Sequence, residues 1–322
     1  MRSDIKKVNE RSVEAFREFA DPIKHAAREL LWLPEAKSLR EKKKGYLKYF
    51  TLPGKWAWDI FFFERNGILE KQGRGFPHVR FCDNNRESYA TAKRLLGNTV
   101  GKRGNFEDVV LNGRKEFWDG FPYDLYNLDF CGTCLPDEQP PFSDTFEAIT
   151  TIIENHVSRR HFPFSLLLTM KALADETNMV AQEELKANIE TNRADACFAD
   201  QINEAIPDTE RFVRANFADF ILISIAKIIC HLAKAHCDVE IRNRAKYPRQ
   251  NGAYFITKFV FAFRGREQRS LRIASPMYAS NVLEAVALNN VMTIDQSCIS
   301  REIKRSHGEL VEYVKSKYEE VV

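Results

Sequence analysis

The order of apolar segments along the chain limits its fold more than any single motif does. Short runs that are almost wholly apolar alternate with segments whose apolar residues recur at helical spacing, a pattern typical of βα units around a parallel sheet. Strands are expected at Tyr46–Leu52, Val79–Cys82, Val109–Leu111, Leu125–Asp129 and Phe164–Met170. Helices are expected over residues 55–67, 86–97 and 143–159. The centre of the chain is therefore expected to be an α/β domain.

The far end of this domain has a different order. After a polar, helical insertion over residues 175–216, an apolar helix over residues 211–235 leads directly into two strands, Cys237–Lys246 and Ala253–Arg264. A Tyr-Pro-Arg-Gln-Asn-Gly segment joins these strands, and its proline and Asn-Gly favour a turn. This order predicts a Rossmann-like, seven-stranded, mostly parallel sheet with a terminal antiparallel strand. A dinucleotide-dependent oxidoreductase is not favoured, since Gly-x-Gly-x-x-Gly is absent and a parallel crossover would replace the hairpin.

Helical additions are expected at both ends of the domain. Residues 1–44 form an arm of two short helices broken at Asp21-Pro22, followed by a charged run, residues 37–45, expected to be a solvated helix face. The domain itself spans residues 45–265. Residues 266–322 are expected to add about three helices, as a plain cap or, alternatively, with a helix-turn-helix over residues 291–317. Self-association or a protein partner would use these terminal helices.

Composition excludes several classes of protein. The net charge of +3 is too small by itself to indicate nucleic-acid binding. The most apolar stretch, Phe217–Ala235, is interrupted by Asp219, Lys227 and His231, so a buried helix is expected rather than a membrane span. Charges near the N-terminus argue against a secretory signal, which makes the cytoplasm the expected location. The absence of P-loop, Gly-x-Ser-x-Gly, His-Glu-x-x-His and EF-hand patterns removes the commonest hydrolases and kinases.

The cysteines and histidines do not predict a metal site. Seven cysteines, an odd number without framework spacing, are expected to be free thiols. Cys131 and Cys134 form a Cys-x-x-Cys pair, but this supplies only half of a tetrahedral zinc site. His156 and His161 are five residues apart and share a helical face poorly. No metal is therefore expected.

Two segments suggest a ligand site at the ends of the first two strands. The turn after the first strand contains Pro53 and Gly54, where glycine permits close approach of a ligand to the backbone and the next helix offers free N–H groups. Asp83 ends the second strand, where one carboxylate can accept hydrogen bonds from both hydroxyls of a ribose. The alternatives are a simple strand-to-helix turn at Gly54 and a helix cap formed by Asp83 or Asn84.

Two later segments complete the pattern. Gly104–Val110 contains Asn105, a polar side chain suited to an exocyclic amine, and Phe106, whose ring would offer a flat apolar contact. The strand Leu125–Asp129 ends in Asp-Phe-Cys-Gly, residues 129–132. A nucleophilic role for Cys131 and a buried structural thiol are both open.

Together these four segments resemble class I (Rossmann-like) S-adenosylmethionine-dependent methyltransferases, over residues 45–265, and identify the chain as a divergent member. Residues 129–132 are similar to the Asp-Pro-Phe-Gly of tRNA guanine dimethyltransferases, with Cys131 departing from the pattern. The resemblance implies S-adenosylmethionine bound by Pro53, Gly54, Asp83, Asn105 and Phe106. It also implies that Asp129 orients a target amine and that Phe130 stacks on a base. The first turn has one glycine where family members usually have several.

Basic residues gather after this core. Between residues 241 and 272 there are nine lysines or arginines and one acid, Glu267. Strand alternation would place Arg242, Arg244 and Lys246 on one face, with Tyr247 beside them. Such a stripe would bind the phosphates of RNA or DNA, and a merely solvated face is the alternative. The sequence thus predicts a methyltransferase that acts on a nucleic acid, with a base amine as its target. The alternative is a non-catalytic relative that binds a nucleotide-like ligand or serves as a subunit.

Overall fold

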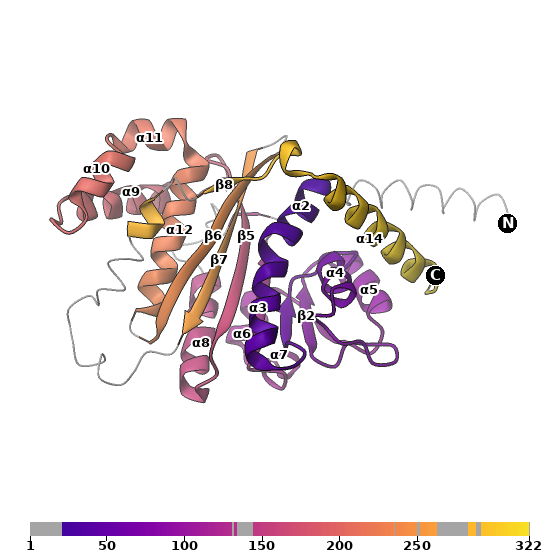
Figure 1. Ribbon diagram of the computed structural model, residues 1–322. Helices are drawn as coiled ribbons and strands as arrows, with labels where there is room; N and C mark the ends of the chain where they lie inside the picture. The colour runs from indigo at the N-terminus through magenta and orange to yellow at the C-terminus, as the bar shows by residue number, and fades with distance from the viewer. Residues whose placement is uncertain are drawn as a thin grey trace.

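One twisted sheet between two layers of helices forms the centre of the molecule (Figure 1). The computed structural model describes residues 21–130, 132–133, 144–234, 236–249, 252–262, 283–287 and 291–321. The strand order is β3-β2-β1-β4-β5-β7-β6-β8. The first five of these strands are mutually parallel, whereas β7 is antiparallel to both β5 and β6. The α/β class is confirmed, but the expected seven strands are wrong because β8 joins β6 in parallel as an eighth.

The strands are short except at the hairpin. They are β1 (Tyr49–Thr51), β2 (Val79–Asp83), β3 (Val100–Arg103), β4 (Leu125–Asp129), β5 (Phe164–Ala172), β6 (Asp238–Arg249), β7 (Gly252–Ala262) and β8 (Met292–Thr293). One face of the sheet is covered by α2 (Pro22–Ala27), the π-helical turn η1 (Arg28–Trp32), α3 (Leu33–Lys43), α4 (Trp58–Arg65), α5 (Arg86–Leu95) and α14 (Arg301–Glu319). The other face carries α6 (Phe106–Leu111), α7 (Lys115–Trp118), α8 (Asp144–Arg159), α9 (Met179–Arg193), α10 (Ala199–Ala205), α11 (Thr209–Ala215) and α12 (Phe217–Ala233).

Both faces of the sheet are buried, which explains why the central strands are apolar on both sides. Neighbouring residues of β1 show the alternation, since Tyr49 packs in the cluster under α2 to α5 and Phe50 in the cluster under α6 to α12. The strands β2, β4 and β5 begin at the residues expected from the sequence. These three strands and the helix layers fix where the polar ends of the strands meet.

The segment around β3 differs from expectation. Residues Val109–Leu111, expected as a strand, lie in α6, where Phe106, Val109 and Val110 share one buried helical face. The third strand is instead the short and mostly polar β3, which is an edge strand. Gly101 is required in it, since an added Cβ would lie 2.3 Å from the ring of Phe81. An apolar run of three residues did not distinguish strand from helix.

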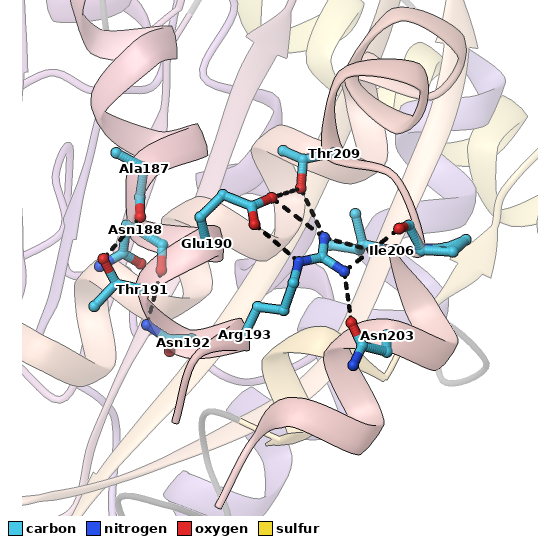
Figure 2. A network of polar contacts seen from close by, with 10 residues as sticks. Ala187, Asn188, Glu190, Thr191, Asn192, Arg193, Asn203, Ile206 and Thr209 are labelled. Carbon is cyan, nitrogen blue, oxygen red and sulfur yellow. Dashed lines mark hydrogen bonds and ion pairs between the residues drawn. The ribbon is translucent and has the colours of Figure 1, made fainter. Parts of the chain in front are cut away.

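The helical insertion after β5 is held together by one arginine (Figure 2). Arg193 of α9 donates hydrogen bonds to the Asn203 side chain at 2.7 Å, the Ile206 carbonyl at 2.8 Å and Thr209 Oγ1 at 2.9 Å. Its Nε also lies 3.0 Å from a carboxylate oxygen of Glu190. These contacts fix α10 and α11 against α9 beside a surface cavity of about 740 Å³.

The apolar helix expected over residues 211–235 is two helices. It breaks at Asn216, where α11 ends and α12 begins, with a bend of 114°. Within the described part of the chain, no single helix is long and apolar enough to cross a membrane. The bent pair α11 and α12 has the length and apolar composition of a membrane span only when the two helices are counted together. Residues 220–230 of α12 are buried between the sheet and the surrounding helices.

The C-terminal helix α14 packs on α2 and α4, so the first and last described helices lie together. Asp21 caps α2 through a 2.8 Å bond from the Ile23 N–H, and the helix continues through η1 and α3 as far as Lys43. His25 of α2 lies 3.1 Å from Ser306 of α14. In the described residues after 290, the 3-10 turn Gln296–Cys298 precedes the single long helix α14, so no helix-turn-helix forms there.

Candidate functional site

The carboxyl ends of β1, β2 and β4 bring the expected site residues to one edge of the sheet. Thr51 at the end of β1 pairs with Phe81 of β2 on one side and with Asn127 of β4 on the other. The three strands are parallel, so the turns that follow them leave the sheet side by side. Gly54, Asp83 and Asp129 therefore lie along the same edge.

The turn between β1 and α4 leaves space above the sheet. Gly54 has a φ of +61°, and a Cβ atom added to it would meet no heavy atom within 4 Å. Pro53 before it is buried. Ala57 takes the N-cap position of α4 with a φ of +49° and offers no side-chain cap. The turn therefore starts α4 without a side-chain cap and leaves an open approach at its only glycine.

Asp83 is half-buried beside this turn. One of its carboxylate oxygens accepts a hydrogen bond from the Asn85 N–H at 2.8 Å. Burial raises the pKa of Asp83, and no described lysine or arginine forms an ion pair with its carboxylate. The cap of α5 is Asn85, whose side chain accepts from the Glu87 and Ser88 N–H groups at 3.0 Å. Asp83 thus shapes the turn and keeps a second oxygen available.

An ion pair links the two turns. Lys55, next to Gly54, lies 2.5 Å from a carboxylate oxygen of Glu87 in the first turn of α5. The ammonium group of Lys55 also lies 5.4 Å from the centroid of the Trp56 ring. These contacts tie the loop after β1 to the helix after β2 at the place where the cofactor is expected.

Of the third segment predicted to contact the cofactor, residues 104–110, only part is accessible to a ligand. Asn105 is exposed and holds the N-cap position of α6 without a side-chain capping bond. Phe106 is 2% exposed and packs against Phe50 and Phe130, with both pairs of ring centroids 6.1 Å apart. Its ring therefore has no face open to a ligand and belongs to the core. Phe130 is half-buried above it.

Asp129 at the end of β4 forms an ion pair that the sequence did not reveal. Lys24 Nζ of α2 lies 2.9 Å from Asp129 Oδ2. Burial lowers the pKa of Lys24, but the neighbouring Asp129 carboxylate outweighs it and raises that pKa above its usual value. Lys24 is therefore a cation that holds one oxygen of Asp129. The residues 131 and 134, for which thiol and zinc roles were considered, lie outside the described residues.

A buried carboxylate below the β1 turn was also missed. Asp59 of α4 is 3% exposed and accepts hydrogen bonds from Tyr49 and Thr51, both at 2.5 Å. The Asn127 side-chain amide donates to the same oxygen at 3.1 Å. This network joins α4, β1 and β4 directly beneath the edge, and burial and Asp59 together raise the pKa of Tyr49. Its role is to fix the turn rather than to face a ligand.

Two further polar atoms at this edge, Asn127 Oδ1 and Thr169 Oγ1, are buried and have no hydrogen-bond partner among the described residues. Thr169 of β5 is in register with Asp129, two residues beyond the Leu167 that pairs with Asn127. Buried polar atoms almost always have a partner, which for these two would be a water molecule or a ligand. The polar edge of the sheet thus extends from Asp83 to Thr169.

The basic stripe expected on β6 does not form. Arg242 pairs with Lys258, whereas Ala245 pairs with Ile256, so β6 has one residue more than β7 at this point. This bulge reverses the alternation of side chains along the strand. Arg242 lies 3.9 Å from Glu35 of α3, but Lys246 reaches α12 across the other face, where its Nζ is 2.6 Å from Asp219.

The remaining residues of the expected stripe are used within the protein. Arg244 is 2% exposed and donates hydrogen bonds to the backbone carbonyls of Glu284, Ala285 and Ala287. Tyr247 is 1% exposed. Arg242 is also paired with Glu240 at 2.6 Å. The prediction that these residues share a face open to a nucleic acid is wrong, because the bulge and the packing of α12 commit them to internal contacts.

The described histidines and acids do not form a metal centre. Among the described residues, no group of three His, Cys, Asp or Glu side chains could hold a metal ion. His156 is fully buried, bonded to the Tyr126 hydroxyl at 2.7 Å and stacked on Phe164 at 3.7 Å. Burial lowers the pKa of His156 to about 3, so its ring is neutral at physiological pH.

No protein-family model matches the chain, and no curated protein matches it.

Proposed function

We propose that the protein is an S-adenosylmethionine-dependent methyltransferase that acts on a nucleic acid. The observation that carries this proposal is the position of Asp83 beside Gly54 at one edge of the sheet. Asp83 is a half-buried carboxylate with a free oxygen, and the space next to the Gly54 backbone is unoccupied by other protein atoms. The strand order supports it, since β7 is inserted antiparallel between β5 and β6 as expected for the class I methyltransferase fold. The parallel strands β1 and β2 bring both residues to one edge.

The chain's own residues fit the parts of this cofactor. The free oxygen of Asp83 would accept hydrogen bonds from ribose hydroxyls, which its partial burial would strengthen. The backbone at Pro53 and Gly54 would lie against the methionine portion, next to the uncapped start of α4. The exposed Asn105 amide would meet the adenine edge. Phe106 is omitted from this set because it is buried.

Asp129 would hold the acceptor. When bound, S-adenosylmethionine supplies an electrophilic methyl group. Asp129 Oδ2 is held by Lys24, which leaves Oδ1 to accept a hydrogen bond from an acceptor amine. This would orient the amine lone pair, and the rate would come from positioning. The half-buried ring of Phe130 would contact the base beside it.

Ligand-linked stabilisation tests cofactor binding. At 100 times its dissociation constant, S-adenosylhomocysteine should raise the free energy of unfolding by about 2.7 kcal/mol, seen as a rise in melting temperature. Asp83→Ala should abolish this rise. Asp195→Ala is the matched control, since Asp195 accepts the same hydrogen bond from the N–H two residues on, at 2.8 Å, on an exposed turn of the helical insertion. No rise in the wild-type protein would contradict the proposal.

Transfer of tritium from labelled S-adenosylmethionine tests the reaction. RNA, DNA and protein fractions are incubated separately with the protein, and label should appear in a nucleic acid and depend on Asp129. Asp129→Ala should remove the label while the melting shift with S-adenosylhomocysteine remains. Label in protein alone would contradict the nucleic-acid assignment.

A second function is favoured by one observation, the ion pair between Lys24 and Asp129. If Asp129 serves only to anchor α2 through Lys24, the protein is a non-catalytic relative that binds a nucleotide-like ligand or acts as a subunit. Stabilisation by S-adenosylhomocysteine without transfer to any acceptor would favour this function. Lys24→Met, which removes the pair, would then leave the absence of transfer unchanged.

A further inference from the structure

Two segments far apart in the sequence meet at the amino edge of the sheet, opposite the candidate site. The C-terminal ends of α3 and α8 lie at the same lower side of the molecule in Figure 1. Lys43 at the end of α3 lies 3.1 Å from His161 Nε2 and 3.1 Å from Asp124 Oδ1. His161, just after α8, lies 2.8 Å from the same Asp124 oxygen. The three side chains fix the two helix ends together.

This junction gathers cations that have no acidic partner. The cations around it come from both segments, and none forms an ion pair with a described residue. We call them the amino-edge patch: Arg40, Lys42, Lys44, Arg159 and Arg160. Lys42, Lys44, Arg159 and Arg160 are exposed, and Arg40 is half-buried. Within residues 40–46 and 159–161 the one acid is Glu41. The neighbouring Asp124 is buried and already held by Lys43 and His161. The patch thus has a clear positive excess.

An exposed aromatic ring lies within the same patch. Tyr46 is 44% exposed, and the Arg40 guanidinium lies 5.2 Å from its ring centroid. Lys44, two residues before it, has a φ of +54° and turns the chain out of α3. Sites for single-stranded nucleic acid combine cations along the backbone with aromatic rings on which bases stack. Cations that only stabilised the helix ends would not require an exposed ring beside them.

We propose that the amino-edge patch binds single-stranded nucleic acid, with phosphates on its cations and a base stacked on Tyr46. The observed charge, exposure and aromatic ring all match this partner, whereas the β6 residues once expected to bind it are committed internally. The inference takes from the proposed function only the class of partner. Because the patch lies at the opposite edge of the sheet from Asp83, it would hold the nucleic acid at a distance from the site of methyl transfer.

Fluorescence anisotropy with labelled 16-nucleotide RNA and DNA of mixed sequence tests the patch in the full-length protein. Five phosphate contacts to a single strand predict a slope of about −3.5 for log affinity against log salt concentration. The variant Lys42→Glu with Arg160→Glu, one residue from each segment, should weaken binding at least about tenfold at low salt. Tyr46→Leu should weaken binding about fivefold or more with an unchanged salt slope, since stacking is not ionic.

A matched control separates this site from general charge. Arg211→Glu with Arg214→Glu changes the net charge equally on exposed positions of α11, which lies at the other end of the molecule in Figure 1. This control should bind the oligonucleotides as the wild type does. Equal weakening in both variants, no binding of either oligonucleotide, or binding only to anionic vesicles or heparin would overturn the proposal.

The failure of this inference is distinguishable from failure of the proposed function. S-adenosylhomocysteine should stabilise the Lys42→Glu, Arg160→Glu variant as much as the wild type, because neither residue is near Asp83. If the protein binds oligonucleotides but is not stabilised by S-adenosylhomocysteine, the proposal for the amino-edge patch stands and the proposed methyltransferase function is contradicted. If S-adenosylhomocysteine stabilises the protein but the patch variants bind oligonucleotides as the wild type does, the proposed function stands and the patch proposal is contradicted.

Discussion

Two polar regions of the sheet differ in how their side chains are used. One is formed by the turns after β1 and β2, and the other is the middle of β6. Both were expected to bind ligands on the strength of polar residues at defined strand positions. After β2, Asp83 makes one backbone hydrogen bond and keeps an oxygen free. On β6, Arg244 makes three bonds to carbonyls and Lys246 is held by both oxygens of Asp219.

The difference follows from where each residue lies relative to the helix layers. Asp83 ends a parallel strand and adjoins the turn at the carboxyl edge of the sheet, outside the helix layers. A residue in the middle of a strand faces a helix layer, where a charge must be paired because burial without a partner is costly. Charge within a buried strand therefore indicates internal pairing more often than a binding surface.

The largest effect that would test this comparison is loss of Arg244. Arg244→Ala should lower the free energy of unfolding by about 3–5 kcal/mol, because it leaves three carbonyls, one of them in the fully buried Ala285, without their charged donor. Arg242→Ala on the same strand is the control, and its half-exposed ion pair should be worth less than about 1 kcal/mol. Urea unfolding measures both. If both variants lose a similarly small free energy of unfolding, Arg244 is not bound internally and is open to a ligand, as the sequence suggested.

Loss of Asp59 should come next. Asp59→Ala leaves the Tyr49 and Thr51 hydroxyls buried without an acceptor, and about 3 kcal/mol of stability should be lost. The measurement is thermal unfolding with and without S-adenosylhomocysteine. A loss below about 1 kcal/mol would mean that the network under the edge is not structural.

Acid should destabilise the packed part of the sheet through His156. Its pKa in the folded protein is about 3, below the unfolded value of 6.5, so the unfolded chain takes up a proton first as pH falls. Stability should therefore be constant above pH 6.5 and fall below it by up to about 1.4 kcal/mol per pH unit. Urea midpoints at pH 7.5, 6.0 and 5.0 measure this. His156→Gln should fall less steeply, and parallel curves for the two proteins would contradict the assignment.

The smallest effect is expected at Asp83 without ligand. Asp83→Ala should change the free energy of unfolding by less than about 1 kcal/mol, since the carboxylate has a single hydrogen bond and a burial penalty that raises its pKa. Thermal unfolding beside Asp59→Ala makes the contrast direct. A loss as large as that of Asp59 would place Asp83 in the structural network instead of the binding site.

Patterns of continuous apolar residues predicted the fold well. Leu125–Asp129 is a strand at the residues expected, and the helix-then-hairpin order correctly predicted antiparallel β7. Short or polar elements were not predictable in this way. The three apolar residues Val109–Leu111 fit a helix as well as a strand, and β3 is a polar edge strand held by its pairing with β2. The break at Asn216 has no proline or glycine to signal it.

The candidate site was predictable only where a residue ends a strand. Gly54, Asp83 and Asp129 lie at one edge because parallel strands place them there. Lys24 could not be predicted beside Asp129, because the contact joins residues 105 positions apart through the packing of α2. The bulge after Arg242 was equally hidden, since one extra residue in β6 is defined only by its pairing with β7.

Hydrogen exchange of backbone amides with and without S-adenosylhomocysteine tests the central claim most directly, because it compares both regions in one experiment. The account predicts slower exchange in residues 52–60, 83–88 and 104–109, and no change in residues 238–249. Unchanged exchange at all of these segments, or protection confined to β6, would contradict it.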